Sequence, residues 1–88
     1  MKQWEYGTLT ASSTRGGAGS IELVTALSTE PVDSDGATMV RQMRALATVA
    51  SDGWEPVGPA NIVQTQDSTF HNYLLRRQRS PEQSQLRW

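Results

Sequence analysis

The stretch Ala37–Ser51, with the sequence ATMVRQMRALATVAS, is the strongest indicator of the fold because its apolar residues repeat with the period of an α-helix. Spacings of three and four residues place side chains on one face of a helix. The apolar residues with this spacing are Met39, Val40, Met43, Leu46, Ala47 and Ala50. The stretch therefore predicts an amphipathic helix, which packs this face on the rest of the fold.

Both ends of this helix carry local signals. The preceding segment, Ser28–Gly36, is rich in aspartate and serine and contains proline and glycine, the residue types of turns and helix N-termini. We expect a turn here, in which either Ser34 or Asp35 caps the helix. Asp52-Gly53 ends the helix, because glycine readily adopts the left-handed conformation found at helix C-termini.

Two extended segments precede the helix. In Gln3–Ala11, Trp4 falls on one side of an extended chain and Leu9 falls on the other, which predicts a first strand. Ile21–Leu27 alternates and contains β-branched residues, so we expect it to pair with the first strand. Between them, Ser12–Ser20 is polar and glycine-rich, which predicts a mobile hairpin loop.

Two more extended segments follow the helix. Pro56 and Pro59 lack amide donors, so we expect the segment Trp54–Gln64 at an edge of the sheet or at a bulge. Residues 66–68 form a turn, and Thr69–Gln78 forms the last strand.

The predicted order is β-β-α-β-β, an α+β fold in which one helix covers one face of a four-stranded antiparallel sheet. Residues 1–79 form a single domain, because a chain of 88 residues rarely supports two cores. Residues 80–88 form a polar C-terminal tail, from which Leu86 and Trp88 could dock on the domain. One helix covers only part of such a sheet, so the remaining apolar side chains must meet water, a ligand or another subunit.

Composition favours self-association. Hydrophobic residues make up 36% of the chain, below the roughly 45–50% of average globular proteins, so the core must be thin. Domains of this size usually need disulfides, a metal or association with other copies. The chain has no cysteine, which excludes disulfides and thiolate metal sites. We therefore expect a homo-oligomer.

Charge and hydropathy favour a cytoplasmic protein. The formal net charge is -1, so no bulk attraction to nucleic acid or anionic lipid is expected. No stretch approaches about 18 consecutive apolar residues, and the N-terminal residues lack the apolar run of a signal peptide. The expected location is the cytoplasm, or the host cytoplasm for a phage-encoded protein, without a membrane partner.

The residue types that carry chemistry in other proteins have simpler structural explanations here. His71 is the single histidine and has no cysteine with which to share a metal, so no metal site and no cofactor are expected. No serine lies in the strand-turn-helix elbow of a nucleophile. Asp33 and Asp35 stand beside turn residues and are best explained by capping. Residues 16–20 are glycine-rich but lack the lysine of a phosphate-binding loop. The sequence therefore predicts no catalytic residues and no enzyme.

Basic residues form a candidate binding surface. Arg76, Arg77 and Arg79 stand at the end of the last predicted strand, with Tyr73 as the candidate stacking partner. Arginine and aromatic side chains together hold single-stranded nucleic acid through phosphate contacts and base stacking. Arginines at a strand end also discourage further strand pairing, which is the simpler explanation.

Four short motifs at the beginning, middle and end of the chain form a recognisable combination. They are the opening Trp4-Glu5-Tyr6, the helix end Asp52-Gly53, the segment Trp54-Glu55-Pro56-Val57, and the final Tyr73-Leu74-Leu75-Arg76-Arg77. Together they resemble a family of short bacterial and phage proteins of unknown function, which have a W-E-Y strand, a G-W-E-L-V segment after a helix and an apolar last strand with basic residues. Pro56 stands in place of the usual leucine. The resemblance implies a small α+β module and assigns no activity.

The two Trp-Glu pairs, Trp4-Glu5 and Trp54-Glu55, each place an indole on one face of a sheet and a carboxylate on the other. We expect both indoles on the inner face, and if the two strands are neighbours, Trp4 and Trp54 pack near each other over the helix.

These observations favour a non-enzymatic module that assembles with copies of itself or binds a protein partner. One alternative is a small nucleic-acid-binding or regulatory protein that uses the arginines of the last strand. Another is an accessory protein that holds a small anionic ligand between subunits, with Arg15 of the glycine-rich loop or Arg41 of the helix at the rim.

Overall fold

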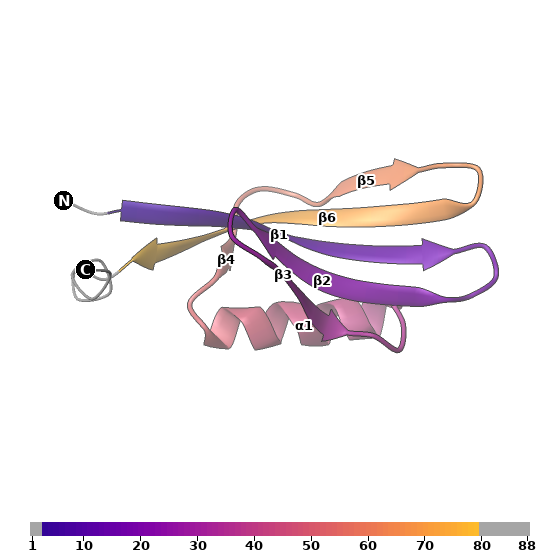
Figure 1. The fold of residues 1–88 in the computed structure, drawn as a ribbon, viewed down its shortest axis with the longest axis horizontal. Helices are drawn as coiled ribbons and strands as arrows, with labels where there is room; N and C mark the ends of the chain where they lie inside the picture. Colours follow the sequence, from indigo (N-terminus) through magenta and orange to yellow (C-terminus); the bar gives the residue numbers. More distant parts are fainter. Residues whose placement is uncertain (1–2, 80–88) are drawn as a thin grey trace.

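The computed structural model describes residues 3–79, which form one helix and a single antiparallel sheet of six strands (Figure 1). The elements in chain order are β1 (Gln3–Thr14), β2 (Gly19–Thr25), β3 (Thr29–Asp33), α1 (Met39–Ser51), β4 (Glu55–Pro56), β5 (Asn61–Gln64) and β6 (Ser68–Arg79). The spatial order is β3-β2-β1-β6-β4, and β5 also pairs with β6. The α+β class is confirmed, whereas the prediction of four strands is wrong. The predicted tail, residues 80–88, lies outside the described residues.

The two additional strands come from segments that local patterns misassign. Thr29–Asp33, expected as part of a turn, forms the edge strand β3 beside β2, with a register shift between Ile21 and Glu22. Its proline is tolerated because the outer side of an edge strand needs no amide donor. The expected strand Trp54–Gln64 is divided into β4 and β5, separated by Gly58 with a φ of 82° and by Pro59. Both pieces pair with one side of β6, so the predicted edge position is confirmed.

The hairpin between β1 and β2 has a shorter loop than predicted. Ser12 pairs with Ser20 and Ser13 pairs with Gly19, so both strands extend into the expected loop Ser12–Ser20. Only residues 15–18 form the turn, in which Gly17 has a φ of 92°. Polar residues are compatible with a strand where the sheet extends beyond its core, because their side chains stay hydrated there.

The helix begins one turn later than the acidic cap signals suggested. Thr38 is the N-cap, and its Oγ1 accepts the amide hydrogen of Arg41 at 3.3 Å. The predicted caps Ser34 and Asp35 are therefore wrong. Asp33 instead accepts the Asp35 amide at 2.9 Å, so its carboxylate shapes the connection rather than the helix end. Gly53 has a φ of 95° and donates its amide to Ala50, which confirms the predicted end of the helix.

The buried face of α1 is rotated away from the predicted one. Gln42, Ala45 and Val49 are its buried residues, whereas Met39 and Met43 are 61% and 66% exposed. The prediction is wrong because it placed only apolar residues on the buried face, whereas the polar Gln42 is also buried there. Its Oε1 accepts the hydroxyl hydrogen of Tyr73 at 2.6 Å and its Nε2 donates to the carbonyl of Ala37 at 2.8 Å, and a buried amide with such partners is tolerated.

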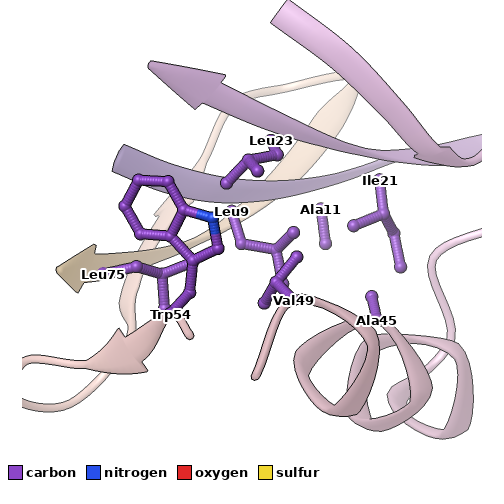
Figure 2. Packing of buried hydrophobic residues seen from close by; sticks show 8 residues of the cluster. All are labelled: Leu9, Ala11, Ile21, Leu23, Ala45, Val49, Trp54 and Leu75. Atoms are coloured by element: carbon purple, nitrogen blue, oxygen red, sulfur yellow. The ribbon is translucent and has the colours of Figure 1, made fainter. Parts of the chain in front are cut away.

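A small core lies between α1 and the sheet (Figure 2). Its buried apolar side chains are Leu9, Ala11, Ile21, Leu23, Ala45, Val49, Trp54 and Leu75. Trp54 contributes the largest side chain and lies beside Leu75. Trp4 is absent from this core. It stands five positions before Leu9, and strand residues an odd number of positions apart point to opposite faces, so Trp4 lies on the face of β1 that points away from the helix. The expectation that both indoles lie on the inner face is wrong for Trp4. β6 also separates β1 from β4, so the two strands are not the neighbours that a contact between the indoles would require.

The molecule is elongated. The described residues have a radius of gyration of 14.3 Å, above the about 12 Å expected of a compact chain of this length. The long ladder between β1 and β6 runs along the main axis, and α1 lies beside β2 and β3, away from β5 (Figure 1). One short helix therefore leaves much of the sheet uncovered.

Candidate interaction surface

The sheet face opposite α1, hereafter the open face, is rich in exposed apolar side chains. Strand residues alternate between the two faces, so the neighbours of the core residues in β1, β2 and β6 point away from the helix. Trp4, Tyr6, Val24 and Leu74 lie on this face and are 37%, 54%, 37% and 46% exposed. These four side chains form the candidate interaction surface.

The strand register brings these residues together. Thr8 of β1 stands opposite Val24 of β2 on one side and Leu74 of β6 on the other. A shallow depression lies here, and Tyr6 is part of its lining. The depression gives the middle of the open face a concave apolar floor that a protruding side chain of a partner can fill.

One end of the open face carries a cluster of Trp4, Arg76 and Glu55. The Arg76 guanidinium carbon lies 4.2 Å from the centre of the Trp4 ring, and the Arg76 Nε donates to Glu55 at 2.6 Å. These contacts join β1, β6 and β4, three strands whose residues are distant in sequence. The guanidinium is therefore occupied by a ring and a carboxylate.

The same arrangement occurs on the helix side of the sheet. The Arg77 guanidinium carbon lies 4.5 Å from the centre of the Trp54 ring, and the Arg77 Nε donates to Glu5 at 2.6 Å. Arg77 also donates to the carbonyl of Asp52 at 3.3 Å, beside the end of the helix. Each arginine thus joins the indole of one Trp-Glu pair to the carboxylate of the other.

The predicted site residues do not form one surface. Arg76 points to the open face, whereas Tyr73 and Arg77 lie on the helix side. Consecutive residues of a strand point to opposite faces, and Arg76 is an odd number of positions from both. Tyr73 is partly buried and bonded to Gln42, so it does not present its ring beside Arg76. Arg79 is the last residue of β6, opposite Gln3.

The remaining predicted arginines are far from the last strand's end. Arg41 lies on α1, and its Nη1 contacts both carboxylate oxygens of Asp33 at 3.0 and 2.9 Å. The Asp35 amide and then Arg41 lower the pKa of the Asp33 carboxyl, because both stabilise its charged form. Arg15 is exposed in the turn between β1 and β2, where its amide donates to the carbonyl of Asp67 at 2.9 Å.

Sequence reasoning missed Val24 and Leu74 as surface residues and placed Trp4 in the core. The signal that identifies them is their spacing from Leu9, Leu23 and Leu75, whose burial defines the helix side of each strand. A residue an odd number of positions from the buried residue of its strand lies on the open face. The alternation of β1 was visible, but the side that faces the helix was not.

Comparisons with protein-family models, with curated proteins and with solved structures gave no match to this chain. The family resemblance of the motifs stays a prediction. In residues 3–79, no three acidic or histidine side chains are grouped as metal ligands would be. No helix in that same range combines the length and the apolar character needed to cross a bilayer.

Proposed function

We propose that this protein is a non-enzymatic assembly module that associates with copies of itself through the open face. The observation that carries this proposal is the exposure of Trp4, Tyr6, Val24 and Leu74 on one uncovered face. Contiguous apolar side chains that one helix cannot cover mark interaction surfaces in small domains.

The charges of the open face favour a second copy over a polyanion. Its charged residues are Glu22, Glu55 and Arg76, and Arg76 is already paired with Glu55. No cation on the described part of this face is left without an acidic partner, so a nucleic-acid phosphate or a lipid headgroup finds no partner there. Two copies of a nearly neutral face can meet without strong repulsion.

The size of the open face fits a stable interface. β1 has 12 residues, about 40 Å in length at the usual rise of a strand. The six strands of the sheet comprise 42 residues, which at a rise of about 3.4 Å and a strand spacing of about 4.8 Å cover about 700 Å². Stable complexes of standard size bury about 800 Å² on each partner.

Sedimentation equilibrium of the wild type and of Leu74→Asp tests the proposal. We expect a discrete oligomer whose dissociation constant rises by at least about 100-fold in the variant, because each contact would bury an unpaired carboxylate. Met43→Asp is the matched control, since Met43 is 66% exposed on α1 and outside the open face. A wild type that stays monomeric at high micromolar concentration would contradict the proposal.

The alternative functions have separate readouts. Nucleic-acid binding through the last strand would appear as salt-dependent oligonucleotide binding that is lost in Arg76→Gln and Arg77→Gln. Capture of a small anion would appear as phosphate binding that is lost in Arg15→Gln or Arg41→Gln. Either result, in a chain that remains monomeric, would replace the assembly proposal.

A further inference from the structure

The strand β5 forms an exposed edge that lacks the usual protection against pairing. All four residues, Asn61–Gln64, are exposed, and Ile62 and Val63 are 58% and 43% exposed. The chain carries no charged residue between Glu55 and Asp67. Natural edge strands are usually protected by charges, prolines or bulges, because an open edge pairs readily with another strand.

The opposite edge of the same sheet has all three protections. β3 contains Pro31 and the charged residues Glu30 and Asp33. The register shift between Ile21 and Glu22 also makes its pairing irregular. The molecule therefore protects β3, whereas on the opposite edge β5 itself contains neither a charge nor a proline.

Hydrogen-bond alternation shows which backbone groups of β5 are free. The Thr65 amide donates to the carbonyl of Ser68 at 2.8 Å, at the closed end of the hairpin with β6. Hydrogen-bonded and non-hydrogen-bonded pairs alternate along antiparallel strands. Val63 therefore bonds toward β6, whereas the amides and carbonyls of Ile62 and Gln64 point outward.

We propose that β5 pairs antiparallel with β5 of a second copy about a two-fold axis at Val63. Ile62 of each copy then stands opposite Gln64 of the other, and their outward amides and carbonyls form four backbone hydrogen bonds. This inference rests on the proposed self-association and adds a second interface to it.

The occupant of this edge is a second copy because the edge is complementary to itself. An uncharged strand introduces no like-charge repulsion across the two-fold axis. Val63 stands opposite Phe70 on the open face. Pairing two β5 strands in one sheet places both open faces on the same side, so the two faces become one continuous surface. Stacking of two such wide sheets through their open faces gives a closed tetramer.

The test is sedimentation equilibrium of Gln64→Pro. Proline removes the outward Gln64 amide, which has no role in the pairing with β6, so we expect the tetramer to become a dimer. Gln66→Pro is the matched control in the adjacent turn, where no described non-glycine residue has a positive φ and where proline is a common residue type. Val63→Arg is a second variant that keeps the backbone amide and places two cations at the axis.

Residue-resolved hydrogen exchange provides an independent readout. We expect exchange of the Ile62 and Gln64 amides to slow at least about tenfold between dilute and assembled protein, because both amides become bonded in the tetramer. In Gln64→Pro this slowing should disappear for Ile62, while the amides between β1 and β6 keep their protection.

The outcomes of these experiments distinguish pairing through β5 from association through the open face. An oligomer that dissociates in Leu74→Asp but is unchanged in Gln64→Pro and Val63→Arg overturns the edge inference and leaves the proposed function intact. If the oligomer dissociates in the β5 variants but not in Leu74→Asp, the result supports pairing through β5 and overturns association through the open face. A monomeric wild type overturns both.

Discussion

Arg76 and Arg77 are adjacent in sequence, but they stabilise opposite faces of the sheet. Arg76 contacts Trp4 and Glu55 on the open face, and Arg77 contacts Trp54 and Glu5 on the helix side. Alternation along β6 requires this division, since consecutive side chains of a strand point in opposite directions. A basic pair that resembles a nucleic-acid site in the sequence is thus engaged within the fold.

The two arginines should contribute unequally to stability. Arg77→Met should lower the free energy of unfolding by about 1–2 kcal/mol, because it loses a partly buried ion pair and its stacking on the buried Trp54 ring. Arg76→Met should cost less than about 1 kcal/mol, since side chains of its ion pair are 40% and 52% exposed. Urea unfolding in a Leu74→Asp, Gln64→Pro background, in which both proposed interfaces are disrupted, measures both effects without a contribution from assembly. Equal effects, or a larger effect at Arg76, would contradict this account.

At the scale of elements, the connection between β3 and α1 depends on one carboxylate. Asp33 ends β3, accepts the Asp35 amide and pairs with Arg41 of the helix. Thr38 then caps α1, so the turn and the cap are separate features. This arrangement holds the N-terminal half of the helix beside β3, while the apolar side chains of Met39 and Met43 stay exposed.

The Asp33 contacts make stability depend on pH in a defined window. The pKa of Asp33 is lowered in the fold, first by the Asp35 amide and then by Arg41. Its stabilising contribution is therefore complete above the ordinary aspartate pKa of 3.8 and is lost as the pH falls through the lower folded pKa. The midpoint of urea unfolding, measured from pH 6 to pH 2 (about the range over which carboxylates titrate), should fall less steeply in Asp33→Asn. Arg41→Met should remove only part of this dependence, because the Asp35 amide remains. Identical slopes in wild type and Asp33→Asn would exclude this role for Asp33.

In the molecule as a whole, the core is thin because many of the large apolar side chains are exposed rather than buried. Among residues 3–79, the large apolar side chains that are exposed are Trp4, Tyr6, Val24, Leu27, Met39, Val40, Met43, Ile62, Val63 and Leu74. They outnumber the buried ones, among which Ala11 and Ala45 are small. An isolated chain of this kind gains little from burial, so assembly should supply part of its stability.

Thermal unfolding should therefore depend on protein concentration. Each tenfold dilution should reduce the stability of the assembled chain by up to about 1 kcal/mol, which lowers Tm by up to about 4–8 °C in a domain of this size. The double variant Leu74→Asp, Gln64→Pro should unfold at a lower Tm that no longer changes with dilution, because both proposed interfaces are lost. Met43→Asp should behave like the wild type. Differential scanning calorimetry over a hundredfold range of concentration checks this expectation. A wild-type Tm independent of concentration would argue against stabilisation by assembly.

The features that depend on neighbouring residues could be predicted from the amino-acid sequence. The helix, its end at Gly53, the alternation of the first strand and the α+β class follow from local periodicity and backbone preference. The edge position of the proline-containing segment was also predictable, because a missing amide donor excludes a central strand.

Long-range packing sets which face of each strand and of the helix is buried and which distant residues meet. The placement of Trp4 outside the core, the burial of Gln42 and the crossed contacts of Arg76 and Arg77 all depend on the register of β1 against β6. A strand pattern is unchanged when its two faces are exchanged, and a helix pattern tolerates a rotation of its buried stripe. The choice is made when segments far apart in the chain pack together, because only then does each side chain have a defined environment.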